Sequence, residues 1–286
     1  MSFGRIILGD NQFLGINHAS PSKAAELSDS FARPDAILEV LVWAYDAGIR
    51  DFMFTTHDRL QPVLHEIATS RLFPGMRYIP CLPYAHKYAN TLTEGGMKAV
   101  FTRHIGGASK RGLAGGLARL AVGDISALMQ LLVEIELVMM RGLPVQGVFL
   151  QNIIFDLIVG LRGNRLLERF HRHVTDHFKA TPGYITMNHP LAQRVLCDEL
   201  GLTQPWICAN FNMAGFRMNP AAQEVEQSYA NGRSKNIAMS VLASGALSAV
   251  ESVDYVRRFQ GVDSILFGSS RKSNIESNIA LIERTA

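Results

Sequence analysis

The stretch GVDSILFGSSRKSNIESNIALI, residues 261–282, contains one repeating unit of the fold. Its run Ser264–Phe267 is short and mostly apolar, which indicates a strand buried on both faces. The small residues Gly268, Ser269 and Ser270 end that run, and a helical stretch follows Arg271. A buried strand, a turn and a helix in this order predict a parallel sheet covered by helices.

The same alternation of strand and helix recurs along most of the chain. The predicted strands are Arg5–Leu8, Asp51–Thr55, Tyr78–Leu82, Gly147–Leu150, Tyr184–Met187, Trp206–Ala209, Asn236–Val241 and Ser264–Phe267. Amphipathic stretches lie between them, such as Asp35–Ala47 before Gly48 and Leu191–Leu200 before Gly201. Eight such units in 286 residues predict one (β/α)8 TIM barrel domain over residues 1–286. A doubly wound open sheet is the main alternative, because it uses the same alternation.

One unit is longer than the others. Between the third predicted strand and a helix that begins near Asp124, residues 83–123 form an insertion rich in glycine and basic residues. An insertion after strand three lies on the face of a barrel where active sites form, and long loops there often act as lids. A surface excursion with short helices of its own is the alternative. Asp124 is a candidate N-cap.

Composition and charge exclude several classes of protein. The chain has 28 Lys and Arg against 25 Asp and Glu, a net charge of +3, and 48% of its residues are hydrophobic. This excludes an intrinsically disordered chain and gives no argument for nucleic acid. Three dispersed cysteines indicate reduced thiols, and no secretory signal or membrane span is visible. We therefore expect a cytoplasmic protein with a small-molecule substrate and no membrane or nucleic-acid partner. The oligomeric state is left open.

The two ends of the chain resemble the aldo/keto reductase superfamily. The motif LGDNQFLGINH (Leu8–His18) is similar to the family's opening strand and glycine turn, and AYDAGIRDFMFTTHDR (Ala44–Arg59) to its first helix and second strand. From residue 183 onward TMNHPLAQRVLCDELG, ANFNMAGF, SVLASGAL and GVDSILFGSSRKSNIESNIALI resemble the fifth to eighth units. Residues 61–182 are compatible with this resemblance but do not add to it. The resemblance implies a (β/α)8 barrel that binds NAD(P)H.

The resemblance also implies where the cofactor binds. By position its contacts would be Ser244, Gly268, Ser269, Ser270, Arg271 and Asn278. A helix N-terminus with hydroxyls and a guanidinium suits an anion. Arg271 and Lys272 would suit the 2′-phosphate of NADP. Two other interpretations remain: the Gly-Ser-Ser turn only caps a helix, or a phosphorylated substrate binds there.

The family's catalytic group is not matched. These reductases use an Asp and a Tyr after strand two, a Lys on strand three and a His on strand four. This chain has Met53 or Phe54 in place of the Asp and His57–Asp58 in place of the Tyr. Strand three ends in Leu82–Pro83, and strand four ends at Gln151–Asn152. Since the family's tyrosine depends on its lysine to titrate near neutral pH, ordinary carbonyl reduction needs another acid.

Polar residues nevertheless follow the predicted strands and would face one mouth. We take His57 as the first candidate acid or base, with Asp58 or Asp10 to orient it, while Asp58 is also a candidate helix cap. His18 and Lys87 are further candidates for proton transfer, and Asn152 for binding a substrate carbonyl. Asn188–His189 and Asn210–Asn212 follow strands five and six.

Two other patterns are interpreted as structural. His171, His173 and His177 lie in ERFHRHVTDHF with helical spacing, but we predict a solvated helix face and no metal. The run GGASKRGLAGG lacks the lysine pattern of a P-loop.

The leading hypothesis is an aldo/keto-reductase-like oxidoreductase that uses NADP on a small carbonyl compound through an altered catalytic group. The first alternative is a non-redox lyase, isomerase or epimerase in which the loops after strands seven and eight bind a substrate phosphate. A metal-dependent barrel hydrolase using His18, His57 and His189, or a binding protein without catalysis, are the others.

Overall fold

In the computed structural model, eight parallel strands close into a barrel in sequence order, each paired with the next and β8 with β1. The structure describes residues 2–17, 20–83 and 125–284. The strands are β1 (Ile6–Leu8), β2 (Asp51–Thr55), β3 (Arg77–Leu82), β4 (Gly147–Leu150), β5 (Thr181–Thr186), β6 (Trp206–Asn210), β7 (Lys235–Met239) and β8 (Ser264–Phe267). The predicted closed barrel is therefore confirmed, and the open sheet is wrong.

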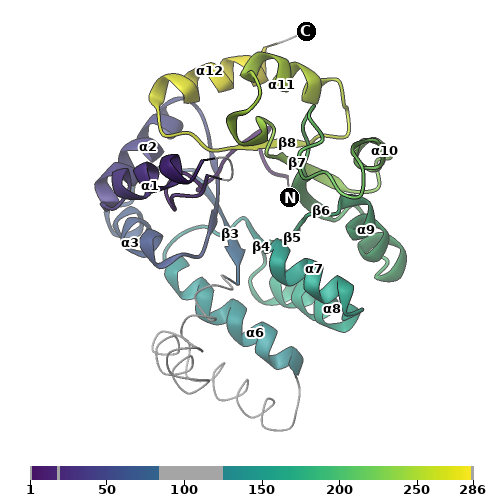
Figure 1. Cartoon of the computed structure of the whole chain (residues 1–286). Helices are drawn as coiled ribbons and strands as arrows, with labels where there is room; N and C mark the ends of the chain where they lie inside the picture. The colour runs from purple at the N-terminus through teal and green to yellow at the C-terminus, as the bar shows by residue number, and fades with distance from the viewer. Residues whose placement is uncertain (1, 18–19, 84–124, 285–286) are drawn as a thin grey trace.

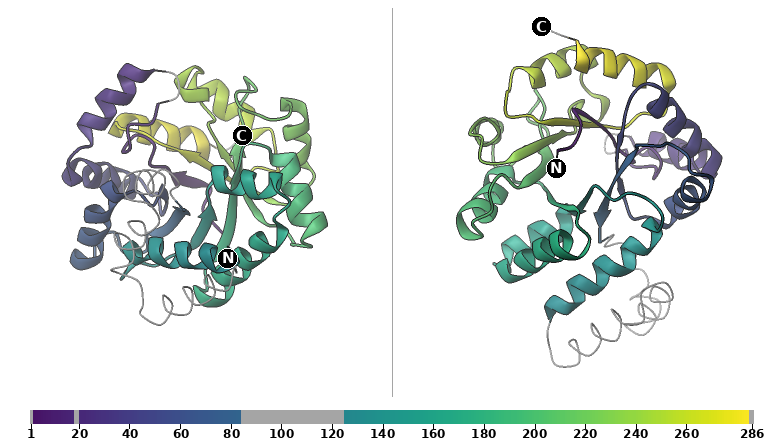
Figure 2. Two further views of the ribbon diagram at one scale, coloured as in Figure 1. Left: turned by 60° about the horizontal axis from the view of Figure 1, so that its bottom comes forward. Right: turned by 180° about the vertical axis from the view of Figure 1, so that it is seen from behind.

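Helices surround the barrel on its outside (Figure 1). They are α1 (Pro21–Ser30), α2 (Pro34–Asp46), α3 (Gln61–Ser70), α6 (Ile125–Glu136), α7 (Asn152–Gly160), α8 (Asn164–Arg172), α9 (His189–Arg194), α10 (Ala222–Ala230), α11 (Ala249–Arg257) and α12 (Lys272–Glu283). Short helical turns are η1 (Asp58–Leu60), η3 (Leu137–Met140), η4 (His173–His177), η5 (Val195–Glu199) and η6 (Ala243–Gly245). The view from behind shows the same ring (Figure 2).

The long connection after β3 is confirmed, because β3 ends at Leu82 and α6 begins at Ile125. Most of the insertion predicted at 83–123, the lid interpretation and the Asp124 cap fall outside the described residues.

The helices form for local reasons that the sequence contains. Proline stands at the first turn of α1, α2, α3 and α9, where its missing N–H costs nothing. Gly48 follows α2 with φ +96°, a conformation that favours glycine, as the sequence predicted. The predicted helix Leu191–Leu200 begins earlier, at His189, and its second half is the π-helical turn η5.

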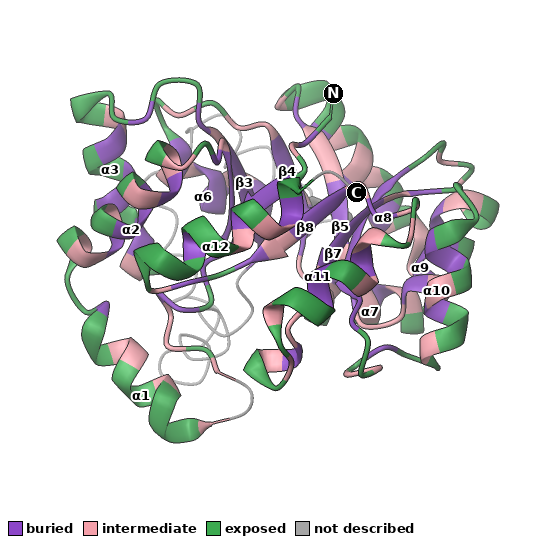
Figure 3. Ribbon diagram, turned by 90° about the horizontal axis from the view of Figure 1, so that it is seen from above, coloured by how far each residue is buried: buried purple, intermediate pink, exposed green. Residues whose placement is uncertain are grey.

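Two apolar layers stabilise the barrel. Its outer face packs against the helices, whose solvent sides are exposed while the strands are buried (Figure 3). The interior is filled by side chains from alternate strand positions, namely Phe3, Ile7, Met53, Ile79, Cys81, Phe149, Trp206, Cys208 and Ile237. Gly183 on β5 is required because a Cβ there would overlap the ring of Phe149.

The N-terminal end of the barrel is closed by an aromatic plug and an ion pair. The ring centroid of Phe3 lies 4.6 Å from that of Trp206 and 5.7 Å from that of Phe149. Asp51 is fully buried; it accepts hydrogen bonds from Arg77 Nε and from the Gly4 amide, each at 2.6 Å. Because this end is plugged, chemistry at the barrel must occur at the opposite end, where the strands finish.

Candidate active site

At the open end of the barrel, polar side chains replace the apolar interior. Thr55 and Gln151 follow the inward-facing Met53 and Phe149 by two residues, so the strand alternation turns them toward the barrel axis. Between β2 and β4 stands β3, whose Cys81 pairs in register with Thr55. The Gln151 side-chain amide donates to the Thr55 hydroxyl at 3.3 Å and so bridges the two strands.

Asp10 extends this polar set to β1. It lies two residues after the last residue of β1 and is only 7% exposed. Its Oδ2 accepts a hydrogen bond from the Thr55 amide at 2.7 Å. Burial raises the pKa of Asp10 from 3.8 to about 7, although the hydrogen bonds from the Thr55 amide and hydroxyl act in the opposite direction. A carboxyl that titrates near neutrality at a barrel mouth is suited to proton transfer.

His57 and Asp58 follow β2 at the same end. His57 is half-buried and is the N-cap of η1, where its Nδ1 accepts from the Arg59 amide at 3.0 Å. Asp58 is exposed and is the first residue of that turn. The prediction that Asp58 caps this helix is wrong, because the cap is the His57 ring. With Nδ1 as an acceptor, the neutral ring carries its proton on Nε2.

The neighbouring Thr56 and Arg59 have structural partners. Thr56 is buried and donates its hydroxyl hydrogen bond to Glu136 of α6, outside the barrel. Arg59 donates to the carbonyl oxygen of Phe13 at 2.8 Å and contacts Ser28 of α1. These two residues tie the loop after β2 to the surrounding helices, so it is held in place around His57.

The loops after β7 and β8 contain the residues that the resemblance assigns to a cofactor. Ser244 has φ +61° and lies between Ala243 and Gly245, which also have positive φ. Ser269 is buried, and its hydroxyl bonds the carbonyl and the amide of Arg271 at 3.2 and 3.3 Å. This hydroxyl orders the turn before α12 and makes no capping bond to the amides of the helix.

The N-terminus of α12 is the most open part of that region. Its N-cap is Arg271, which makes no side-chain capping bond, and no acidic residue lies in the first turn. Arg271 is exposed. Lys272 Nζ lies 3.9 Å from Glu276 Oε1, and both of these side chains are exposed to solvent. Uncapped amides beside two cations fit a phosphate group. Asn278, two turns later, is half-buried.

Gln12 joins the β1 and β8 loops. It is 6% exposed, its Nε2 donates to the Gly9 carbonyl at 2.8 Å, and its Oε1 is buried without a hydrogen-bond partner. A Cβ at Gly268 would overlap this oxygen, so a larger residue there would require the Gln12 side chain to move. Because β8, β1 and β2 are consecutive in the ring, Arg271 and His57 belong to the loops on either side of the β1 loop, at the same mouth.

Several predicted site residues are placed elsewhere. His189 is fully buried away from the mouth: its Nδ1 is 2.7 Å from Ser228 Oγ and its Nε2 is 2.8 Å from Asn236 Oδ1. The proposed metal set containing His189 is therefore wrong. Asn188 caps α9 by accepting from the Leu191 amide, so it too has a structural role. Among the described residues, no group of three His, Cys, Asp or Glu is arranged to hold a metal.

The remaining predictions divide into three groups. His18 and Lys87 lie outside the described residues. Asn152 is the half-buried first residue of α7, at the end of β4 as predicted. The solvated helix face predicted for the three histidines is wrong for His171 and His173. His171 Nδ1 is 2.9 Å from the Tyr184 hydroxyl, and His173 Nε2 is 3.6 Å from Glu134.

Sequence reasoning gave Asp10 only a supporting role. The available signal was an acidic residue directly after an apolar strand and glycine, LGD, in a position that the barrel buries. Gln12 was missed altogether, since nothing in its local sequence distinguishes it from a surface residue.

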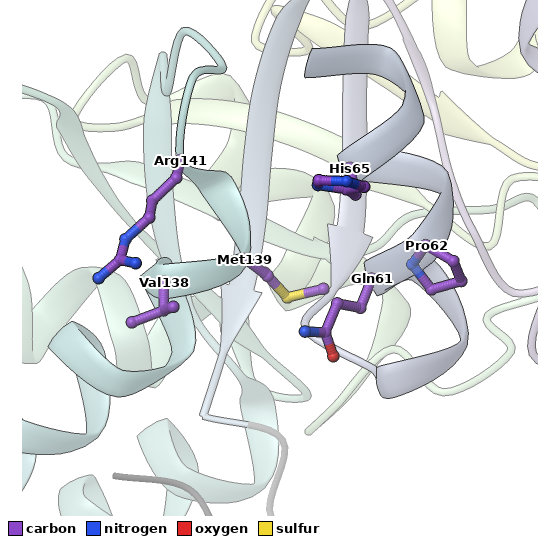
Figure 4. Close-up of a pocket in the computed structure, with 6 residues that line it drawn as sticks. All are labelled: Gln61, Pro62, His65, Val138, Met139 and Arg141. Atoms are coloured by element: carbon purple, nitrogen blue, oxygen red, sulfur yellow. The ribbon is translucent and has the colours of Figure 1, made fainter. Parts of the chain in front are cut away.

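A hollow of about 470 Å³ lies between α3 and η3, where Gln61, Pro62 and His65 face Val138, Met139 and Arg141 (Figure 4). It lies between helices outside the barrel, and none of the mouth residues lines it. The candidate active site is therefore the mouth, where the buried carboxyl and the strand ends meet. Within the described residues, no helix has the length and apolar character needed to cross a bilayer.

Solved structures that superpose on this chain include aldo-keto reductases. A protein of Pseudomonas aeruginosa described as an aldo-keto reductase superposes with TM-score 0.62 at 14% identity, covering 99% of this chain and 90% of that one. MGS-M4, an aldo-keto reductase from a deep-sea metagenome library, gives TM-score 0.56 at 11% identity over 100% and 88% of the two chains. A variant of Gox0644 in complex with NADPH gives TM-score 0.54 at 10% identity over 100% and 88%.

No family model matches the sequence, and no curated protein matches it. At 10 to 14% identity the structural likeness concerns the fold. The resemblance stated from the sequence motifs is thus confirmed at that level: the chain has the barrel fold of the aldo-keto reductases.

Proposed function

We propose that this protein is an NADPH-dependent reductase of small carbonyl compounds with an altered catalytic group. The observation that carries the proposal is the uncapped N-terminus of α12, with Arg271 and Lys272 beside it, on a barrel with the aldo-keto reductase fold. Such a helix end binds phosphate groups through its free amides, and a guanidinium adds charge-assisted bonds. Among the structural neighbours, the Gox0644 variant is in complex with NADPH.

The residues would divide into two groups. Ser244, Gly268, Ser270, Arg271 and Asn278 would hold the cofactor, with Arg271 and Lys272 on the 2′-phosphate, while Ser269 orders the turn. When bound, NADPH would supply hydride to the carbonyl carbon. The polar strand ends of β1, β2 and β4 would bind the carbonyl and supply the proton, with His57, Asp58 and Asn152 among the candidates there.

The experiment is direct binding of NADPH and NADH, followed by calorimetry or by the fluorescence of the reduced nicotinamide. We expect micromolar NADPH binding that Arg271→Ala weakens about tenfold, the loss of one charge-assisted interaction. NADH binding should change less, because it lacks the 2′-phosphate. Arg258→Ala, an exposed arginine at the end of α11, is the matched control. NADPH binding weaker than millimolar in the unmodified protein would refute the proposal.

The second candidate is a non-redox lyase, isomerase or epimerase whose substrate phosphate occupies the same helix end. The absence of the family's tyrosine after β2, where the chain has His57–Asp58, favours it. Both candidates use Arg271, so the adenosine part of the cofactor separates them. If inorganic phosphate and sugar phosphates bind while NADPH and adenosine 2′-phosphate do not, the non-redox function is the correct one.

A further inference from the structure

The mouth contains a chain of hydrogen bonds among residues that do not correspond to the catalytic residues of the aldo/keto reductases. Gln151 Nε2 donates to Thr55 Oγ1 at 3.3 Å, and the Thr55 hydroxyl and amide both bind the Asp10 carboxylate, the amide at 2.7 Å. Gln151 follows β4, Thr55 ends β2 and Asp10 follows β1, so the pairing of the strands around the barrel brings the three residues together. Their common end point is one buried carboxyl group.

We propose that Asp10 is the catalytic proton donor of this enzyme and takes the role that a tyrosine has in the related reductases. The inference deepens the proposed reductase function and rests on it. In the reaction, the carbonyl carbon accepts hydride, with its two electrons, and the carbonyl oxygen accepts the Asp10 proton. NADPH would supply that hydride, so the products would be an alcohol, NADP⁺ and a carboxylate at Asp10, which then takes up a proton from solvent.

The surroundings of Asp10 suit a carboxyl group that is still protonated near neutral pH. At 7% exposure, Asp10 is largely removed from water, which disfavours its ionised form. The two bonds from Thr55 stabilise that ionised form and limit the shift, so the pKa is about 7 instead of far above it. A general acid works best when its pKa lies near the working pH, which this balance achieves.

The groups packed around Asp10 do not remove its proton. On β3, the Cys81 thiol interacts electrostatically with Asp10, and its own pKa is raised well above 9.0 by burial, so it stays neutral. From the β2 loop, Arg59 donates to backbone oxygens of the β1 loop and α1, and His57 Nδ1 accepts from the Arg59 amide. On β4, Gln151 binds Thr55 and carries no charge.

His57 is the rival donor, and its local role makes it the weaker one. Its Nδ1 is used in capping η1, so ring movement would disrupt the turn that precedes α3. Asp10 makes no comparable cap. Substitution of each residue therefore separates the two assignments.

The first test measures protonation directly and needs no turnover. Carboxyl carbons of aspartate are labelled and followed by NMR from pH 5 to pH 9 in the unmodified protein, Asp10→Asn, His57→Gln and Asp254→Asn. Asp254 is an exposed carboxylate of α11 and serves as the control. We expect a signal titrating near pH 7 that only Asp10→Asn removes. The comparison of variants is needed because burial also raises the pKa of Asp156.

The second test measures catalysis, with 4-nitrobenzaldehyde as the carbonyl probe and NADPH as the reductant. We expect Asp10→Asn to lower kcat at least 100-fold, the usual size of general acid catalysis, and to leave NADPH binding within about twofold. In the unmodified protein kcat/KM should fall above about pH 7, as the acid of the free enzyme loses its proton. Thr55→Val should move that fall to higher pH, because the hydroxyl bond that stabilises the carboxylate is gone.

The outcomes separate the two proposals. If NADPH binds and is oxidised by the carbonyl, but Asp10→Asn changes neither kcat nor the titration, the assignment of Asp10 is overturned while the reductase function stands. A large loss of kcat in His57→Gln, without a loss in Asp10→Asn, also overturns the assignment of Asp10 and leaves the reductase function standing. If NADPH does not bind, the proposed function is overturned, and with it the reduction step assigned to Asp10. Melting curves identify any variant that fails to fold. If Asp10→Asn does not fold, the pH at which the rate of the unmodified protein falls, and its shift in Thr55→Val, decide the assignment.

Discussion

A buried carboxyl group with a raised pKa makes the folded protein less stable as pH rises, and Asp10 should show this effect strongly. Its pKa moves from 3.8 to about 7 on folding because burial removes water from the carboxyl group. The folded state therefore holds this proton more tightly than the unfolded state. The stabilisation from proton binding is complete below pH 3.8 and is lost as pH rises through 7.

The size of the effect follows from the shift. One pKa unit is worth about 1.4 kcal/mol, so a shift of roughly three units is worth about 4 kcal/mol between the two pH limits. About 3 kcal/mol of this change lies between pH 5 and pH 8. It is a large part of the stability of a typical domain, roughly 5–15 kcal/mol.

The assay is urea unfolding at several pH values for the unmodified protein and Asp10→Asn. The asparagine retains an oxygen that can accept the Thr55 amide but does not ionise. We expect Asp10→Asn to gain stability relative to the unmodified protein by about 3 kcal/mol from pH 5 to pH 8. Other groups titrate in both proteins, so their contributions cancel in the difference. A difference that stays constant over this range would refute the reasoning, because it would show that Asp10 ionises normally.

Three further predictions concern the rest of the barrel. Burial lowers the pKa of His189 to about 4, so His189 destabilises the folded state as pH falls from about 6.5 to 4. His189→Gln should flatten that part of an acid unfolding curve, and an unchanged curve would contradict the shift. Gly183→Ala should lower the free energy of unfolding by about 1–3 kcal/mol, measured by thermal unfolding, because the new Cβ overlaps Phe149. Adding Phe149→Leu to this variant should recover part of the loss. If the effects of the two substitutions simply add, the overlap is not their cause. Asp51→Asn should lower the free energy of unfolding by about 2 kcal/mol, measured with urea at low salt, because the buried carboxylate binds Arg77 and the Gly4 amide. If the variant is as stable as the unmodified protein, the Asp51–Arg77 pair contributes nothing to stability.

The fold could be predicted because its signal is local and repeated. All eight strands were expected from apolar runs, and their boundaries differ where another effect acts. The fifth strand was predicted from Tyr184, but it begins at Thr181. The prediction began too late because Pro182 and Gly183 interrupt the apolar run. Gly183 nevertheless belongs to the strand, where it leaves room for the ring of Phe149. The strand predicted to reach Val241 ends at Met239, because Ser240 has φ +56° and cannot continue it.

The site was harder to predict because its residues meet only in three dimensions. His189 was expected at the mouth because it follows a strand, but it begins α9 and turns toward Ser228 and Asn236. The proposed cofactor loop was predicted from the motif resemblance and from helix-end arguments, which need no tertiary contact. The burial of Asp10, in contrast, depends on the approach of β2 to β1, which local sequence does not encode.

This chain lacks the tyrosine that the aldo/keto reductases carry after strand two, and the arrangement of the strand ends offers another position for a proton donor. In a closed barrel, residues after different strands reach the same opening, so a proton donor on β1 can stand close to one that would follow β2. Asp10 lies one strand from the expected position and is bound to the Thr55 amide at the end of β2. A tyrosine needs a lysine to lower its pKa toward neutrality, whereas burial raises the pKa of a carboxyl group into the same range, here limited by the bonds from Thr55. If Asp10 is the donor, as we propose, no lysine on strand three is needed, and one physical cause would account for both differences from the aldo/keto reductase pattern.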